Sequence, residues 1–231
     1  TIPHRKLFVY NNNVSLNKKI IVNTNFKKLI IKNINISTIF DLNNYKNIRE
    51  SFQLEYLKII NCNISPYFDL FEFISNFPKL RYLVIDHCKN LNEQSINNID
   101  KLKLNTFIFI PHKLFLLYLS LEILAPNLKL SNSIEHLNIN NNYVNLDFMN
   151  QLTNFRFLSK INFSKCLKID NNSLLLLSNN QKLNDLNVSY CYRITDKGSY
   201  YLKNLKNVRH LNLSYLTRIT DVSIDYLTKI R

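Results

Sequence analysis

Residues 186–202 read LNVSYCYRITDKGSYYL, and residues 211–227 read LNLSYLTRITDVSIDYL. The chain therefore contains nearly the same sequence twice, 25 residues apart. The apolar residues of this repeated segment recur at the same spacing along the whole chain, and successive copies of the repeat begin 22 to 30 residues apart. The copies begin at His4, Phe26, Leu54, Leu80, Leu104, Ile134, Leu158, Leu183 and Val208. A period of this size predicts a solenoid, in which each repeat forms one coil that packs on its neighbours.

All copies share one frame, which we number from the first apolar residue as position 1. Apolar residues fill positions 1, 4 and 6, as at Leu183, Leu186 and Val188, except that the first copy has His4 at position 1. This alternation predicts a short strand whose side chains at positions 3, 5 and 7 point away from the core. A helix start follows, where Thr195 or Thr220 can cap the N-terminus. Each repeat is therefore expected to form one strand and a helix or partial helix.

The four cysteines occupy a single place in this frame, position 9. They are Cys62, Cys88, Cys166 and Cys191. The chain leaves the strand there and turns inward, and a small side chain with a weak hydrogen-bonding group can contact the backbone of the neighbouring coil. We interpret the cysteines as a ladder of buried structural thiols, with metal binding or a disulfide as the alternatives. Free thiols indicate a reducing, intracellular compartment, cytoplasmic or nuclear.

The pattern C-x-x-I-T-D-x-G over residues 191–198, and its shorter copy I-T-D at 219–221, resembles the cysteine-containing leucine-rich repeats of F-box/leucine-rich-repeat proteins. The resemblance implies an α/β fold, a leucine-rich-repeat solenoid of about nine repeats with a parallel concave sheet and convex helices. It also implies the substrate-recognition arm of an F-box-type ubiquitin ligase, with the ligase adaptor bound through a region outside this sequence. We expect residues 1–231 to form a single solenoid, as an excerpt of a longer chain.

Composition excludes some functions. The chain contains only one glycine, Gly198, so it cannot form the glycine-rich loops that bind phosphates. The net charge is +14, and residues 1–60 hold half of it, with ten Lys and Arg against three acidic residues. No metal-ligand motif is present. In the trio Asp86-His87-Cys88, the cysteine belongs to the buried ladder, so a Cys/His nucleophile is not expected. The sequence predicts no enzyme and no cofactor.

The outward positions of the early repeats are aromatic, aliphatic and basic, and exposed apolar patches often bind partners. We predict the partner-binding surface there. Its residues are Phe8, Tyr10, Lys28, Ile30, Lys32, Tyr56, Lys58, Ile60, Tyr82, Val84 and Ile108. Tyr56 and Tyr82 are expected to anchor the partner. The matching positions of the late repeats are polar, with Asn187 and Asn212 among them.

A second unusual stretch is KLFLLYLSLEILA at residues 113–125, within an irregular insertion near 113–133. Its apolar residues would lie all round a helix, so it either folds back on the solenoid or docks a partner. The candidate docking residues are Leu116, Leu117, Leu119 and Ile123. The stretch is shorter than the ~20 apolar residues of a membrane span.

Three functions fit these observations. The leading one is a non-catalytic scaffold or recognition module that binds one or more proteins. The alternative is a structural subunit of a large assembly, which the apolar 113–125 stretch favours. The weakest is contact with nucleic acid, which rests on the basic bias and on Tyr10, Tyr56 and Tyr82 among lysines.

Overall fold

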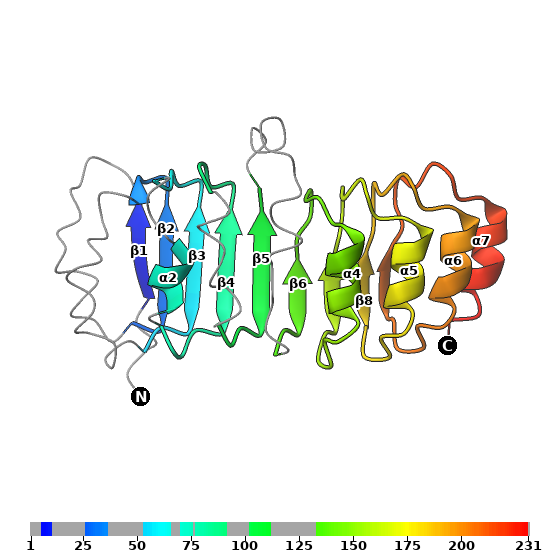
Figure 1. Cartoon of the computed structure of the whole chain (residues 1–231), viewed down its shortest axis with the longest axis horizontal. Helices are drawn as coiled ribbons and strands as arrows, with labels where there is room; N and C mark the ends of the chain where they lie inside the picture. The colour runs from blue at the N-terminus through cyan, green and yellow to red at the C-terminus, as the bar shows by residue number, and fades with distance from the viewer. Residues whose placement is uncertain are drawn as a thin grey trace. The chain divides into compact units, whose positions relative to one another are not determined.

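The computed structural model describes the backbone of residues 6–10 and, with side chains over nearly all of them, residues 26–36, 53–65, 70–75, 77–91, 102–111 and 133–230. The chain divides into two compact units, residues 1–119 (unit 1) and 120–231 (unit 2). Figure 1 labels the helices and strands in chain order. The insertion and the apolar stretch predicted at 113–125 lie outside the described residues.

Unit 1 is built on five parallel strands that pair in chain order (Figure 1). They are β1 (Lys6–Tyr10), β2 (Lys28–Lys32), β3 (Tyr56–Ile60), β4 (Tyr82–Asp86) and β5 (Thr106–Ile110). Each strand begins at position 3 of its repeat, and equal positions pair with one another, as Leu29 with Leu57 and Leu57 with Leu83. In β2 to β5, positions 4 and 6 are buried, and they form the core on one side of the strands. Helix α2 (Leu70–Ser75) belongs to the third repeat.

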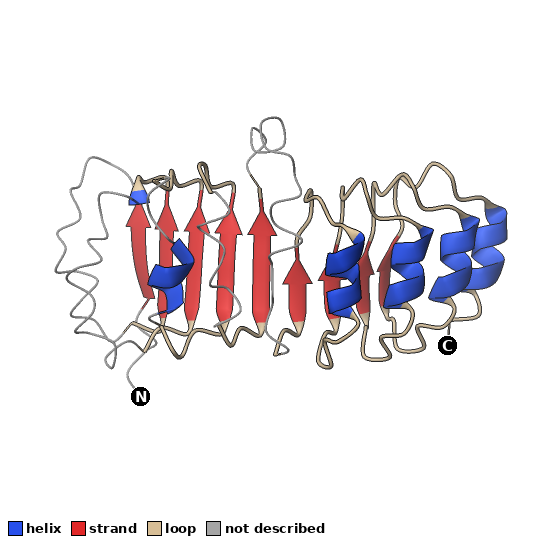
Figure 2. Ribbon diagram, viewed as in Figure 1, coloured by secondary structure: helices blue, strands red, loops and turns tan. Residues whose placement is uncertain are grey.

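Unit 2 repeats a complete coil of one strand and one helix. Its strands are β6 (His136–Asn138), β7 (Lys160–Asn162), β8 (Asp185–Asn187) and β9 (His210–Asn212). Its helices are α4 (Leu146–Leu152), α5 (Asn171–Leu177), α6 (Asp196–Leu202) and α7 (Asp221–Leu227). The strands pair in parallel, each helix packs against the next, and Figure 2 shows the helices in front of the strands. The predicted coil of strand and helix is confirmed here.

The strands of unit 2 are three residues long, whereas those of unit 1 are five. The cause is an asparagine at position 5 of every unit 2 repeat. Its side-chain oxygen accepts the backbone N–H of position 7, as Asn187 Oδ1 does from Ser189 N at 3.0 Å. The same bond is made by Asn138, Asn162 and Asn212. Because the side chain takes a backbone donor, the chain leaves the strand after position 5. Unit 1 has Ile30, Lys58, Val84 and Ile108 at this position.

The four cysteines are free, buried and aligned. Each thiol donates to the position 6 carbonyl of the preceding coil. The Sγ–O distances are 3.2 Å from Cys166 to Ile139 and from Cys191 to Phe163. In unit 1 they are 3.9 Å from Cys62 to Ile31 and 3.6 Å from Cys88 to Ile59. The thiols therefore join adjacent coils from inside the core.

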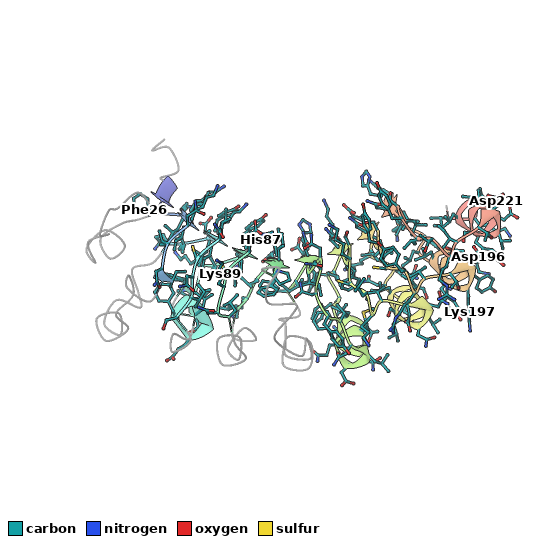
Figure 3. All side chains as sticks on the ribbon, turned by 90° about the horizontal axis from the view of Figure 1, so that it is seen from above. Phe26, His87, Lys89, Asp196, Lys197 and Asp221 are labelled. Atoms are coloured by element: carbon teal, nitrogen blue, oxygen red, sulfur yellow. The ribbon has the colours of Figure 1, made fainter. Side chains whose placement is uncertain are left out.

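At the starts of helices α6 and α7, side-chain hydrogen bonds reach from one coil to the next. The Asn171 side chain holds Thr195, accepting from its backbone N at 2.9 Å and donating to its Oγ1 at 3.0 Å. Asp196 holds Thr220 by accepting from both its backbone N and its Oγ1, each at 2.8 Å, and it also contacts the Ser223 hydroxyl. We call each of these contacts an inter-coil clasp. Figure 3 shows Asp196 and Asp221, the first residues of α6 and α7.

The clasp changes one prediction about helix caps. Thr220 caps α7, because its side chain accepts from Val222 N at 3.3 Å. Thr195, the other predicted cap, makes no side-chain cap bond to α6. Thr195 therefore occupies the predicted N-cap position, but its hydroxyl accepts from Asn171 of the preceding coil and does not bond the backbone of α6.

Candidate partner-binding surfaces

The first candidate surface is the outward side of the unit 1 strands, which we call the lysine–tyrosine face. Its described residues are positions 3, 5 and 7 of β2 to β5. Those that stay half-buried, with part of the side chain at the surface, are Lys28, Ile30, Lys32, Tyr56, Lys58, Ile60, Tyr82, Asp86, Ile108 and Ile110. One carboxylate, Asp86, stands among three lysines on this face. The face is therefore basic and partly apolar, as the sequence predicts.

Three side chains at position 3 form a continuous stack on this face. The rings of Tyr56 and Tyr82 lie 4.3 Å apart between centroids and 11° from parallel. The Lys28 ammonium lies 4.0 Å from the Tyr56 ring centroid, within the range of a cation–π contact. Burial, with the neighbouring Tyr82 hydroxyl as the second cause, raises the pKa of Tyr56 above its usual value. Both rings are thus held in place before any partner binds.

The structure differs from the predicted surface at Val84. This side chain is only 3% exposed, so it offers a partner little area. The backbone of β1 pairs with β2 and brings Phe8 opposite Ile30 and Tyr10 opposite Lys32. The side chains of Phe8 and Tyr10 lie outside the described part. The same holds for the predicted docking residues Leu116, Leu117, Leu119 and Ile123.

The trio at the end of β4 does not assemble a nucleophile. Cys88 is 2% exposed and its thiol faces the Ile59 carbonyl in the core. His87 turns to the surface and contacts the carboxylate of Asp86 through Nδ1. Over the described residues, no group of three or more His, Cys, Asp or Glu side chains could hold a metal ion.

A second candidate surface, which the sequence analysis missed, lies where the unit 2 strands end. Position 8 adopts a left-handed backbone with positive φ in seven repeats. These residues are Asn33, Asn61, His87, Asn141, Lys165, Tyr190 and Tyr215. Asparagine tolerates this conformation, but a bulky side chain in it costs about 1–2 kcal/mol. Tyr190 and Tyr215, with φ of 62° and 63°, therefore hold a strained backbone.

These strained residues form a second stack of one lysine and two tyrosines, which we call the turn stack. The rings of Tyr190 and Tyr215 lie 4.2 Å apart and 13° from parallel. The Lys165 ammonium lies 5.4 Å from the Tyr190 ring centroid. Tyr192 meets Tyr190 edge to face at 6.4 Å. The sequence does hold a signal for this site, since position 8 is Asn in four repeats and Tyr in two consecutive ones.

Comparison with known proteins identifies the fold. No protein-family model and no curated protein matches this sequence. The similar solved structures include two leucine-rich-repeat proteins. An internalin (inlF) from Listeria monocytogenes is 18% identical with a TM-score of 0.51, and the match covers 90% of this chain and 66% of that one. The mouse RP105/MD-1 complex is 17% identical with a TM-score of 0.51, over 89% of this chain and 37% of that one.

The chain thus spans less than two thirds of the length of either similar protein. The shared feature is the architecture, a parallel sheet with one strand per repeat, and the predicted leucine-rich-repeat solenoid is confirmed. In the described part of the chain, none of the helices combines the length and the apolar character needed to cross a bilayer.

Proposed function

We propose that this chain is a non-catalytic protein-binding module and that its partner contacts the lysine–tyrosine face of unit 1. The observation that carries the proposal is the stack of Lys28, Tyr56 and Tyr82. A partner that binds rings already fixed by stacking loses little side-chain entropy, which strengthens binding. The fold is consistent with this function, because RP105, in a similar structure, is found in complex with the protein MD-1.

A narrower role follows from the resemblance of residues 191–198 to F-box/leucine-rich-repeat proteins. We propose that the module is the substrate-recognition arm of a ubiquitin ligase, with the adaptor bound by a region outside residues 1–231. An intracellular location, cytoplasmic or nuclear, belongs to the same proposal. It is supported by four buried free thiols at one position of the coil.

The test has two steps. The full-length protein is expressed with an affinity tag, its partners are identified by mass spectrometry, and the dissociation constant of the most enriched partner is measured by calorimetry. The same constant is then measured for the Tyr56→Ala/Tyr82→Ala variant. We expect a loss of about 2 kcal/mol or more, roughly 30-fold in affinity, as for a pair of aromatic anchors.

The matched control keeps the same position of the coil. Lys160 and His210 are exposed residues at position 3 in unit 2. The variant Lys160→Ser/His210→Ser should bind as the wild type does. Asn187 and Asn212 are unsuitable controls, because their side chains hold the strand ends. Equal affinity of the tyrosine variant and the wild type, in proteins with the same unfolding temperature, would place the binding site elsewhere. Enrichment of a ligase adaptor would support the narrower role, and its absence from the purified complexes would count against it.

A further inference from the structure

The turn stack carries an inference because the fold does not need tyrosine where it stands. At the same position in unit 1, Asn33 and Asn61 adopt the same left-handed backbone with an amide side chain. Asn61 Nδ2 donates to Asn33 Oδ1 at 2.9 Å, so asparagine even joins adjacent coils there. Tyr190 and Tyr215 keep a backbone that asparagine adopts at lower cost. An observed strain of this kind points to a function for the side chain.

The side chains around the turn stack are exposed and basic. Tyr215 is 64% exposed, Tyr192 44% and Leu167 60%. Next to them, at position 11 of successive repeats, stand the exposed cations Lys168, Arg193 and Arg218. Together with Lys165, these make four cations on one edge of unit 2. Across the described residues, none of the four forms an ion pair with a carboxylate.

Three carboxylates lie within three residues of these cations: Asp170, Asp196 and Asp221. In the described part of the chain, Asp221 forms no ion pair with Arg218, and the other two are already engaged. Asp170 accepts from Ser173 N at 2.9 Å and from the Ser173 hydroxyl at 3.0 Å, as the cap of its own helix. Asp196 is held in the clasp to Thr220 and Ser223. The edge therefore presents unpaired positive charge beside exposed aromatic and aliphatic area, and its electrostatic complement is an anionic partner.

We propose that the turn stack and its four cations form a second binding surface, which docks an acidic segment of a partner protein. Guanidinium groups and tyrosine hydroxyls are donors that suit carboxylates, and the exposed ring edges and Leu167 suit apolar residues between the acids. This surface belongs to unit 2 alone. It does not depend on the lysine–tyrosine face of unit 1.

The arrangement of the rings favours a protein over a single-stranded nucleic acid. Bases bind aromatic side chains by stacking on free ring faces. The faces of Tyr190 are occupied, since the ammonium of Lys165 comes from the preceding coil and the ring of Tyr215 from the following coil. What Tyr190 presents outward is its edge and its hydroxyl. The neighbouring Tyr215 hydroxyl is the main cause that raises the pKa of Tyr190.

The experiment measures the fluorescence anisotropy of a labelled oligoglutamate peptide and, separately, of a labelled oligothymidylate, each titrated with the 1–231 chain at physiological ionic strength. We expect saturable binding of the peptide that is tighter than binding of the oligothymidylate. The Arg193→Ser/Arg218→Ser variant should bind the peptide at least about tenfold more weakly, as for loss of a binding hot spot. Lys197→Ser/Lys206→Ser removes the same charge from exposed positions away from the edge and should change little.

The tyrosines are tested by the residue that the fold itself uses at this position. Tyr190→Asn/Tyr215→Asn should weaken peptide binding about tenfold while the unfolding temperature stays the same or rises, because asparagine relieves the strain. Tyr56→Ala/Tyr82→Ala should leave peptide binding unchanged, which separates this proposal from the function of unit 1. The proposal is overturned if the peptide does not bind, if the oligothymidylate binds more tightly, if the Lys197/Lys206 variant loses as much affinity as the arginine variant, or if the tyrosine variant binds like the wild type.

Discussion

Both units of this chain carry a stack of one lysine and two tyrosines, but they place it at different positions of the same frame. In unit 1 the stack of Lys28, Tyr56 and Tyr82 stands at position 3, on strands whose backbone is unstrained. In unit 2 the stack stands at position 8, where Tyr190 and Tyr215 hold a left-handed backbone. The repeat thus aligns equal residues of adjacent coils wherever they occur, and the position decides which side of the molecule displays them.

The two units also end their strands differently. In unit 2 the asparagine at position 5 takes the N–H of position 7, and the thiol of the next coil then approaches the position 6 carbonyl to 3.2 Å. In unit 1, position 7 remains within the strand, and the thiols stay 3.6 to 3.9 Å from the corresponding carbonyls. In unit 2, adjacent coils are therefore joined at the strand ends by the position 5 asparagine and the cysteine thiol together. In unit 1, the longer strand provides this connection between coils.

The largest expected effect tests this pairing at position 5. Asn187→Ala removes the side-chain oxygen that accepts from both the backbone N and the hydroxyl of Ser189. Ser189 is only 4% exposed, so water cannot readily replace this acceptor. We expect a loss of about 1–3 kcal/mol in the free energy of unfolding, the usual cost of an unsatisfied buried donor. Lys58→Ala, at the same position in unit 1, should change it by less than about 0.5 kcal/mol. Urea titration followed by circular dichroism measures both, and equal losses would contradict the contrast between the units.

A smaller difference is expected between the cysteines. Cys191→Ala and Cys88→Ala each remove a buried sulfur, but the first also removes a shorter hydrogen bond to a backbone carbonyl. We expect Cys191→Ala to cost about 1 kcal/mol more, the typical net value of one hydrogen bond. The same urea titration decides the matter, and a larger cost for Cys88→Ala would show that thiol distance does not govern the contribution.

Acid should weaken unit 2 through the clasp at Asp196. The hydrogen bond from Ser223, followed by the bond from the Thr220 backbone, lowers the pKa of Asp196 below its usual value. A carboxyl whose folded pKa lies below its unfolded value of about 3.9 stabilises the fold above that pH, and the contribution is lost as pH falls through the folded pKa. Asn171 makes the same clasp with an amide. Asp196→Asn should therefore reduce the drop in unfolding temperature between about pH 6 and pH 3, and an unchanged drop would assign acid sensitivity to other groups.

The smallest expected effect is kinetic. The neighbouring thiol of Cys88 lowers the pKa of Cys62, whereas burial raises the pKa of Cys191 to about 12 and also raises that of Cys166. Because the thiolate is the reactive form, Cys62 should be labelled first by a maleimide in the native protein, and all four thiols should react fast only after denaturation. Peptide mapping by mass spectrometry measures the order. Labelling of Cys191 before Cys62 would contradict it.

Much of the architecture could be predicted from the sequence, because each repeat carries its own frame. The start of every strand, the inward positions 4 and 6, and the aligned cysteines all follow from spacing. The length of the unit 2 strands does not follow from spacing, although Asn162, Asn187 and Asn212 all stand at position 5 of the repeat. Their role depends on the backbone donor that each side chain reaches, which alternation alone does not reveal.

The surfaces were only partly predictable for a related reason. Tyr56 and Tyr82 lie on an outward strand position, so periodicity places them at the surface. Val84 shares that periodicity and is still buried, because periodicity gives the side of the strand and not the cover that neighbouring side chains provide. Tyr190 and Tyr215 lie just beyond the strand, where alternation gives no direction, and their backbone conformation decides where they point.

The inter-coil clasp and the thiol ladder share a polarity with consequences for synthesis on the ribosome. The side chains of Asn171 and Asp196 form hydrogen bonds with a threonine of the following coil. The thiol of Cys191 donates to a carbonyl of the preceding coil. A nascent coil of unit 2 therefore meets partners that have already emerged. Such a chain can fold sequentially during synthesis, with each folded coil providing the surface on which the next coil packs.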